Sequence, residues 1–463
     1  METKANTIPT SDRIAYVTAR VGFTLIISLY SGSYLSLFLN VICGLPMPTI
    51  ASVLAIAKLI DLAEVLMFQP VLFSWAAKGK WGRYRTWFVV SPIGCLFGHV
   101  LLQTALTAAV PNSVKIPFVI IGYVTVNATL NIQSTAMNSM NAIWIKDPVD
   151  RFRTQTQGNL MNNLASTLFG FAMLPIMYAI GGVESINAKG MTFLVILYNV
   201  FNIIACIPVF RFTKRLDLDS GAGGGKTNVF SAIKLLFTNR NAAGLFMSAA
   251  LANSGQSSWA QAFAFIFLYY YKRPDVLSVY NGFQRGIMML ANMLTLAIVK
   301  RLKPKVAFTA SLIMPCINYL FVYFFANDAV TAVVFVCIAY MFTGVYQSTL
   351  TPLYGDIVDY TRWKTGESII ANIFTIQQAT PKASSYIGNF MVTAIAAIGF
   401  AANNPETHTP EILARLKALA CFIPAGLYAC GLLTFFTVFN IPAKVMEQAR
   451  AELAERDKAA QTS

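Results

Sequence analysis

About a dozen long apolar stretches run between Ala15 and Asn440, and each is long enough to cross a lipid bilayer. A helix needs about 20 mainly apolar residues to span the hydrocarbon core. Hydrophobic residues make up 56% of the 463 residues and charged residues only 12%, whereas soluble domains carry roughly 25% charged residues. A water-soluble fold could not bury this much apolar surface, so the sequence predicts an all-α membrane protein.

Twelve transmembrane helices are predicted, joined by short connections. The predicted spans are residues 15–39, 48–75, 87–109, 117–145, 158–182, 190–211, 242–271, 276–299, 306–326, 329–355, 367–400 and 418–441. This set uses most of the chain and leaves no room for a separate soluble domain.

The Lys and Arg residues are distributed unevenly between the two sets of connections. Basic clusters follow the even-numbered spans, as in KGKWGRYR after the second and KRLKPK after the eighth, and the other connections carry few basic residues. Because basic loops near helix ends stay in the cytoplasm, we expect a multi-pass protein of the cytoplasmic (inner) membrane with both termini in the cytoplasm. The net charge of +15 follows from this sidedness and from contact with anionic membrane lipid, so no nucleic-acid partner is predicted.

The longest cytoplasmic connection falls near the middle of the chain and is rich in glycine. It predicts a flexible hinge between two six-helix halves. The predicted organisation is a first half at residues 1–210, a hinge loop at 211–241, a second half at 242–441 and a cytoplasmic tail at 442–463. Basic clusters at matching places after the second and eighth spans indicate that the halves are duplicated.

Three predicted cytoplasmic loops carry more specific patterns. They are KxKWGRYRTW at Lys78–Trp87, KDPVDR at Lys146–Arg151 and GDIVDYTRWKTG at Gly355–Gly366. In order and spacing they resemble the loops of the glycoside-pentoside-hexuronide:cation symporters, the melibiose-carrier family of the major facilitator superfamily. The resemblance implies the major facilitator fold and secondary active transport by alternating access.

Charged residues of these loops can form ion pairs that close the cytoplasmic side and break when it opens. The residues predicted to form this cytoplasmic gate are Arg83, Arg85, Asp147, Arg151, Asp356 and Asp359. For any single loop residue, a purely topogenic charge is the alternative.

Ionised side chains inside the predicted spans are costly and are therefore usually functional. The four cations and two carboxylates of this kind are Arg20, Lys58, Arg285, Lys382, Asp61 and Glu64. An excess of buried positive charge is unfavourable unless an anion visits it. We therefore expect a negatively charged substrate, such as a hexuronide or another acidic sugar.

The family resemblance assigns roles to some of these positions. Lys382 stands where the family has a cavity lysine, and the second span, with Asp61 and Glu64, is where the family places its cation-coupling carboxylates. Arg20 stands at an acidic position of the family and Asn159 at an arginine position. The cavity thus departs from the family pattern, and proton or anion-exchange coupling is as plausible as sodium coupling.

Amide and aromatic side chains gather in spans that can face a central pathway. Together with the cations, the predicted substrate-binding residues are Arg20, Asn131, Asn159, Asn163, Gln256, Trp259, Gln284, Arg285 and Lys382. Amides offer donors and acceptors to sugar hydroxyls, and an indole face can support a sugar ring. Interhelical hydrogen bonding is the alternative for any single amide.

These patterns predict a monomeric secondary active transporter that moves a sugar or acidic sugar derivative, with cation-coupled symport as the expected mode. A carrier of lysolipids or other amphiphiles with the same fold is one alternative, and a non-transporting membrane sensor is another. The expected partners are a sugar or organic anion and membrane lipid, with Na⁺ or H⁺ as a possible coupling ion. No cofactor, metal site, catalytic residue or enzyme activity is predicted.

Overall fold

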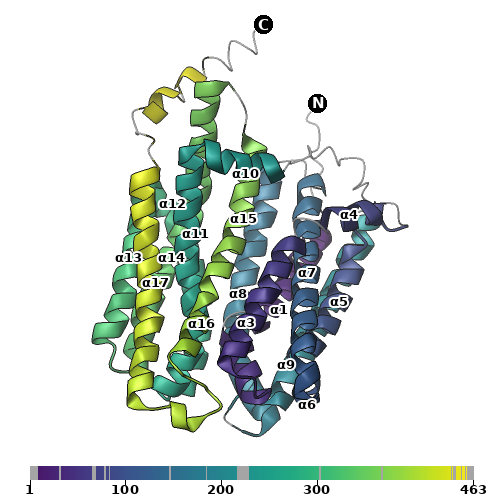
Figure 1. Cartoon of the computed structure of the whole chain (residues 1–463). Helices are drawn as coiled ribbons and strands as arrows, with labels where there is room; N and C mark the ends of the chain where they lie inside the picture. The colour runs from purple at the N-terminus through teal and green to yellow at the C-terminus, as the bar shows by residue number, and fades with distance from the viewer. Residues whose placement is uncertain are drawn as a thin grey trace. The chain divides into compact units, whose positions relative to one another are not determined.

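The computed structural model describes residues 9–30, 33–64, 69–77, 80–82, 84–144, 148–183, 185–215, 229–301, 304–366, 369–439, 441, 445–449, 451–453 and 455. All regular structure in these ranges is helical. Each of the predicted spans coincides with one helix or with successive helices (Figure 1). The all-α class expected from the apolar stretches is therefore confirmed.

The helices before the central connection follow one another closely. They are α1 (Thr10–Tyr30), α2 (Ser33–Leu37), the π-helix η1 (Phe38–Ile42), α3 (Met47–Ala63), α4 (Gln69–Ala77), α5 (Trp87–Leu102), α6 (Ala105–Ala109), α7 (Asn112–Trp144), α8 (Pro148–Gly181), α9 (Ala188–Phe212) and the 3₁₀ turn η3 (Thr213–Arg215).

The second set begins with a short helix inside the predicted hinge loop. Its members are α10 (Val229–Thr238), α11 (Arg240–Phe265), the π-helix η4 (Ile266–Tyr270), α12 (Pro274–Arg301), α13 (Pro304–Phe325), α14 (Ala329–Thr365), α15 (Ile370–Gly388), α16 (Phe390–Ala397), the 3₁₀ turn η5 (Pro405–Thr407) and α17 (Pro410–Val438).

Within the described residues, seven helical segments are long and apolar enough to cross a membrane, and the pair formed by Thr10–Leu29 and Ser33–Ile42, bent by 45°, makes an eighth. α11, α12 and α15 fall outside this set. Each of these three helices carries residues from the predicted binding set, namely Gln256, Arg285 and Lys382. These three helices therefore carry polar side chains that could face a polar pathway.

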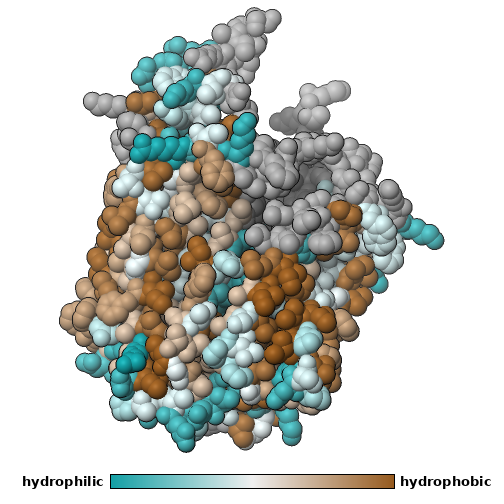
Figure 2. Space-filling model, viewed as in Figure 1, coloured by the Kyte–Doolittle hydropathy of each residue, from teal (hydrophilic) through white to brown (hydrophobic). Residues whose placement is uncertain are grey.

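The surface of the helices agrees with a membrane environment. Figure 2 shows hydrophobic residues over the flanks of the helices, with hydrophilic residues gathered near helix ends. Phe97, Leu168 and Leu433 are 60%, 59% and 62% exposed. In water, apolar exposure on this scale would be unfavourable, so these side chains are positioned to face lipid.

Residue contacts divide the chain into two compact units. Unit 1 contains Met1–Gly224, Gln261–Gly286 and Val392–Leu416, and unit 2 contains Gly225–Ala260, Ile287–Met391 and Lys417–Ser463. Two segments that belong to the predicted second half therefore pack with the first half. The predicted boundaries at residues 210, 241 and 441 stay a prediction.

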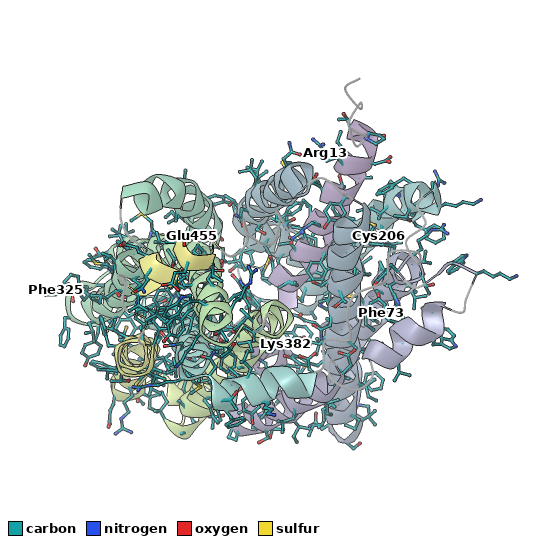
Figure 3. All side chains as sticks on the ribbon, turned by 90° about the horizontal axis from the view of Figure 1, so that it is seen from above. Arg13, Phe73, Cys206, Phe325, Lys382 and Glu455 are labelled. Atoms are coloured by element: carbon teal, nitrogen blue, oxygen red, sulfur yellow. The ribbon has the colours of Figure 1, made fainter. Side chains whose placement is uncertain are left out.

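Unit 1 is built on packing of α1 against α8 and α9, of α5 against α7 and α9, and of α3 against α7. A buried apolar cluster joins residues of α1, α4, α5, α7 and α9. Phe73 and Cys206, both labelled in Figure 3, belong to this cluster. The ring of Phe73 meets that of Trp87 edge-on, with centroids 5.7 Å apart, so α4 is fixed to the start of α5 by close ring packing.

In unit 2, α13 packs against α14, and α15 packs against both α14 and α10. Buried aromatic rings pack in its interior. The ring centroid of Trp259 in α11 lies 5.4 Å from that of Tyr319 in α13, and the Tyr319 centroid lies 6.2 Å from that of Tyr428 in α17. A Cβ atom at Gly255 would lie 2.8 Å from the Tyr428 ring. The absence of a side chain at Gly255 therefore lets α11 and α17 approach closely.

The first predicted span ends in a π-helical turn, η1, which follows α2. After η1, the N–H of Cys43 donates to the carbonyl of Phe38 at 3.1 Å, and the N–H of Leu45 donates to that of Leu39 at 3.0 Å. Gly44 between them has φ 68°. This left-handed conformation suits glycine because it has no Cβ atom.

The first helix of the predicted second half ends in the same way. After η4, the N–H of Tyr271 donates to the carbonyl of Ile266 at 3.0 Å, and the N–H of Arg273 donates to that of Phe267 at 2.9 Å. The left-handed position is taken here by Lys272, with φ 53°. Two equivalent turns with the same hydrogen-bond pattern support the duplication indicated by the sequence.

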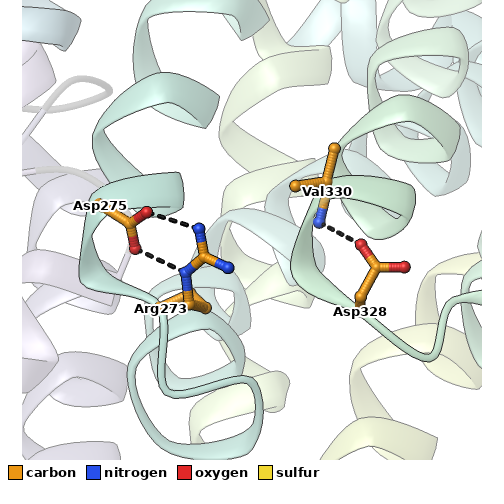
Figure 4. A network of polar contacts seen from close by, with 4 residues as sticks. All are labelled: Arg273, Asp275, Asp328 and Val330. Atoms are coloured by element: carbon orange, nitrogen blue, oxygen red, sulfur yellow. Dashed lines mark hydrogen bonds and ion pairs between the residues drawn. The ribbon is translucent and has the colours of Figure 1, made fainter.

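Two acidic side chains stabilise the starts of later helices (Figure 4). Arg273 donates to both carboxylate oxygens of Asp275 at 2.9 and 2.7 Å, and these bonds lower the pKa of Asp275 from 3.8 to about 2. Asp328 caps α14 by accepting from the backbone N–H groups of Val330 and Thr331, each at 2.9 Å. Hydrogen bonds from Thr331 lower the pKa of Asp328.

Candidate functional site

A pair of carboxylates at the C-terminal end of α3, Asp61 in the helix and Glu64 directly after it, shares one donor from α7. The side-chain Nδ2 of Asn131 donates to Asp61 at 2.7 Å and to Glu64 at 3.3 Å. Glu64 is buried, with 7% of its surface exposed. The three-residue spacing from Asp61 to Glu64 places both on one side of α3, and the packing of α3 on α7 brings Asn131 to them. The structure thus joins the two predicted coupling residues through an amide.

This cluster can hold positive charge. Two carboxylates in a low-dielectric interior need compensation from a cation, a proton or a basic side chain. Lys58 lies on the same helix, three residues before Asp61, and Tyr123 of α7 is close enough to Asp61 to interact with it electrostatically. The predicted role of Asn131 in substrate binding stays a prediction, and its described bonds place it with the carboxylates.

Arg20 is a half-buried cation on α1. Its Nη1 donates to the hydroxyl of Tyr16 at 3.3 Å, and its guanidinium lies 5.9 Å from the centre of that ring. A Cβ atom at Gly158 of α8 would lie 3.3 Å from Cδ of Arg20. The lack of a side chain at Gly158 therefore leaves room for the Arg20 side chain between α1 and α8. The planar guanidinium could bind an anionic group through paired hydrogen bonds.

Lys382 is a half-buried cation on α15 of unit 2 (Figure 3). Thr380 and Ser384 stand two residues before and two residues after it in the chain. Ser384 donates to the backbone carbonyl of Ala250 at 2.9 Å, which ties α15 to α11, and Thr380 donates to the carbonyl of Ile376 in its own helix at 3.0 Å. These bonds fix the turn of α15 that carries the ammonium.

The α11 residues of the predicted site have different environments. Gln256 is half-buried, and its Nε2 contacts the sulfur of Met288 at 3.9 Å. Trp259 is fully buried and packs against Tyr319. In this conformation a sugar could reach the indole of Trp259 only after a rearrangement, so its proposed stacking role stays a prediction. Asn253 donates to the hydroxyl of Tyr346 at 3.1 Å, an interhelical bond of the kind expected for such amides.

The remaining predicted site residues are only partly described. Asn163 and Gln284 are half-buried in unit 1. The side chains of Arg83, Asp147, Arg151, Asn159 and Arg285 lie outside the described residues. Among the described members, the structure brings together Asp61, Glu64 and Asn131, whereas Gln256, Trp259 and Lys382 belong to the other unit.

Arg85 of the predicted cytoplasmic gate contacts the end of α9. Its Nε and Nη2 donate to the backbone carbonyl of Phe210 at 3.4 and 3.2 Å, and its guanidinium lies 4.4 Å from the centre of that ring. Trp81 also meets Phe210 edge-on at 5.4 Å. The described contacts of Arg85 therefore join the loop before α5 to α9, and its role in a gate ion pair stays a prediction.

Two further predicted gate residues, Asp356 and Asp359, lie on a helix that is longer than a membrane span. α14 has 37 residues, which at about 1.5 Å per residue exceeds the roughly 30 Å hydrocarbon core. Asp356 and Asp359 are half-buried near its end. The helix stops at Gly366, with φ 75°.

The tail is attached to this end of α14, which the sequence interpretation did not foresee. The indole N–H of Trp363 donates to a carboxylate oxygen of Glu452 at 2.6 Å. Residues 445–449 and 451–453 are helical, and Met446, Ala449 and Leu453 are buried. Their spacing of three and four residues is typical of an amphipathic helix, and this signal was available in the sequence.

Membrane-spanning helices that carry polar and charged groups define a polytopic membrane protein. The chain belongs to the family described as "MFS/sugar transport protein", whose model matches residues 16–443. This agrees with the major facilitator resemblance of the loop motifs. Proteins of this family are transporters and not enzymes, and their substrates are small molecules such as sugars.

Two curated relatives are similar over most of the chain. The "Putative sulfoquinovose importer" of Escherichia coli (strain K12) is 21% identical over 464 residues, covering 97% of this chain and 96% of the relative. The "Putative 2,3-dihydroxypropane-1-sulfonate exporter" of the same organism is 23% identical over 370 residues, covering 76% of this chain and 78% of the relative.

Solved structures show the same fold. A D-xylose-proton symporter matches with TM-score 0.65 at 11% identity, covering 93% of this chain and 98% of its own. The nucleoside transporter NupG matches with TM-score 0.59 at 14% identity, covering 94% of this chain and 100% of its own. The major facilitator fold predicted from the sequence is therefore confirmed.

Proposed function

We propose that this transporter carries an anionic sugar, of the sulfonated class, across the cytoplasmic membrane by alternating access. The observation that carries the proposal is the presence of half-buried Arg20 on α1 and half-buried Lys382 on α15, two helices of the predicted spans. Ionised side chains at such depth usually line a substrate pathway. An anionic substrate can pair with either of them through charge-assisted hydrogen bonds.

A sulfonate fits these cations better than a neutral sugar would. It stays ionised at physiological pH and presents three oxygen acceptors, which match the donors of a guanidinium and an ammonium. The names of the two curated relatives both refer to sulfonates, one of them a sugar. At this level of identity the names support the substrate class and do not determine it.

We further propose that transport is coupled to a cation at Asp61 and Glu64, with H⁺ or Na⁺ as the ion. The two carboxylates converge on the amide of Asn131, and their negative charge is compensated when a cation or proton joins them. An incoming cation would also offset the charge of an incoming sulfonate.

The proposed orientation places both termini in the cytoplasm. The basic connections, which include the exposed Lys80, Lys214 and Arg362, then lie beside the anionic inner leaflet. We propose that the protein works as a monomer, because a single chain with this fold can form a complete transport pathway.

Counterflow in proteoliposomes tests the proposal. Vesicles that contain the protein and are loaded with unlabelled sulfoquinovose should take up the labelled compound. Vesicles that contain the Lys382→Ala variant should not. Unlabelled glucose, which differs only by a hydroxyl in place of the sulfonate, should compete poorly. Preference for glucose would overturn the anionic substrate class, and competition by a lysophospholipid alone would favour the amphiphile carrier. Ligand binding without any counterflow would favour the sensor.

A further inference from the structure

We propose that Gly170, in the middle of the fifth predicted span on α8, and Gly282, two turns inside α12, form the inner limit of a closed gate that extends to the helix ends following odd-numbered spans. The proposal rests on the alternating-access function stated above. It concerns unit 1 alone, in which segments from before and after the central connection pack against each other.

The α8–α12 contact is a close crossing of two backbones. A Cβ atom at Gly170 would lie 2.7 Å from the carbonyl oxygen of Asn281, and a Cβ atom at Gly282 would collide with the ring of Phe171. Phe171 in turn meets Phe283 edge-on at 5.5 Å. Because small residues let helices approach at this distance, the two glycines permit the closed packing and any larger residue opposes it.

Polar contacts close the same end between α2 and the later helices. The N–H of Ala264 in α11 donates to the hydroxyl of Ser33 at 3.3 Å, and the amide of Asn281 donates to the hydroxyl of Tyr34. The ring of Tyr34 also meets that of Phe263 edge-on at 5.7 Å. Ser33 and Tyr34 are buried, with 0% and 3% of their surface exposed.

The segment between α16 and α17 contacts the π-helical turn η1. The N–H of Asn403, in the segment between α16 and α17, donates to the side chain of Asn40 at 3.1 Å. Asn40 is fully buried and donates to the carbonyl of Leu45 at 2.8 Å. The connection thus holds the π-helical turn that ends the first span.

The contacts of Ser33, Tyr34 and Asn40 lie toward one side of the membrane in the proposed orientation, and the Gly170 contact lies near the middle of its span. α2 and η1 end the first span, η4 ends the seventh, and the segment with Asn403 joins the last two. These are the weakly basic connections, which lie outside the cytoplasm when the termini lie inside. The geometry therefore describes the carrier closed to the outside, and opening must separate α8 from α12 and α2 from α11.

Cross-linking tests the closed contact directly. In a background without native cysteines that still transports, the pair S33C and A264C should form a disulfide on oxidation, because these residues meet through a backbone N–H and a short side chain. Uptake should be lost on oxidation and restored by reduction. Failure to cross-link, or full uptake after complete cross-linking, would overturn the gate.

A labelling experiment remains informative even if the substrate class is wrong, because it measures access and not flux. Ser33→Cys should react slowly with a membrane-impermeant maleimide from outside, and Gly282→Val should raise that rate. A minor open state holds at most about a tenth of the molecules, so a shift to mainly open molecules predicts an increase of roughly tenfold or more.

Gly426 provides the matched control, since a Cβ atom there would meet nothing within 4 Å. Gly426→Val should leave both labelling and uptake unchanged. Size-exclusion profiles of the two variants should match, which shows that Gly282→Val is folded. A labelling rate for Gly282→Val equal to that of Gly426→Val would contradict the proposal.

Discussion

The charged groups of the two units are arranged differently. In unit 1, Asp61 and Glu64 are buried or half-buried and share the amide of Asn131. In unit 2, Lys382 stands half-buried on α15, in the turn that Ser384 ties to α11 by donating to the carbonyl of Ala250. The difference teaches that the carboxylates proposed for coupling and Lys382, one of the two cations proposed for substrate binding, belong to separate units, while Arg20 shares unit 1 with the carboxylates. It predicts variants that lose substrate binding and others that lose only coupling.

The largest effect is expected at Lys382. Lys382→Ala removes a charge-assisted contact of about 3 kcal/mol, which corresponds to roughly a hundredfold in affinity. Uptake of labelled sulfoquinovose should fall to background while expression stays normal, and Lys382→Arg should retain part of it. Lys214→Ala, at an exposed lysine, should transport like the original protein. Uptake that survives Lys382→Ala would remove this residue from the site.

Asp61→Asn and Glu64→Gln should separate coupling from binding. Each keeps the size of the side chain and removes one charge of the cluster, so the site can no longer draw in a cation. Uphill accumulation in an ion gradient should disappear while counterflow persists. Uphill accumulation and counterflow should be measured in the same vesicles. Equal loss of both activities would place Asp61 and Glu64 in the substrate site instead.

The shared amide predicts a smaller effect. Asn131→Ala removes the donor common to Asp61 and Glu64 and should lower the free energy of unfolding by about 1–3 kcal/mol. The thermal midpoint in detergent, with and without Na⁺, measures this. Asn127→Ala is the control, because the Asn127 amide donates to the backbone carbonyl of Tyr123 in its own helix at 3.0 Å. Equal midpoints for the two variants would argue against the bridging role.

The smallest effect is expected at the two π-helical turns. Gly44→Ala introduces a Cβ atom at a left-handed residue and should lower the free energy of unfolding by about 1 kcal/mol, whereas Lys272→Gly should raise it by up to about 1 kcal/mol. Opposite shifts in the thermal midpoint of the two variants would support the view that Gly44 and Lys272 occupy equivalent left-handed positions. Shifts of the same sign would break it.

Much of the fold follows from the sequence because bilayer-spanning helices must bury their own backbone hydrogen bonds and expose apolar side chains. The apolar stretches therefore located the helices, and the spacing of Asp61 and Glu64 placed them on one side of α3. Hydropathy alone could not place Asn131 beside them, since that contact depends on the register of α3 against α7.

Other features depend on tertiary packing in the same way. Trp259 resembles a sugar platform in the sequence, yet its indole is buried against Tyr319. The bond from Trp363 to Glu452 joins residues 89 positions apart, and the close crossing at Gly170 and Gly282 requires two helices that the sequence does not pair. The sequence can mark these residues as unusual for their position, but it does not show which residues they contact in the fold.

The central claim is that cations within the membrane select a negatively charged sugar. Isothermal titration of the purified protein with sulfoquinovose and with glucose tests it most directly, because the two ligands differ only where the charge lies. The account predicts measurable binding of sulfoquinovose, at least tenfold weaker binding of glucose, as expected for about 1.4 kcal/mol or more of charge-assisted contact, and loss of this preference in Lys382→Ala. Equal or tighter binding of glucose by the unmodified protein would contradict it.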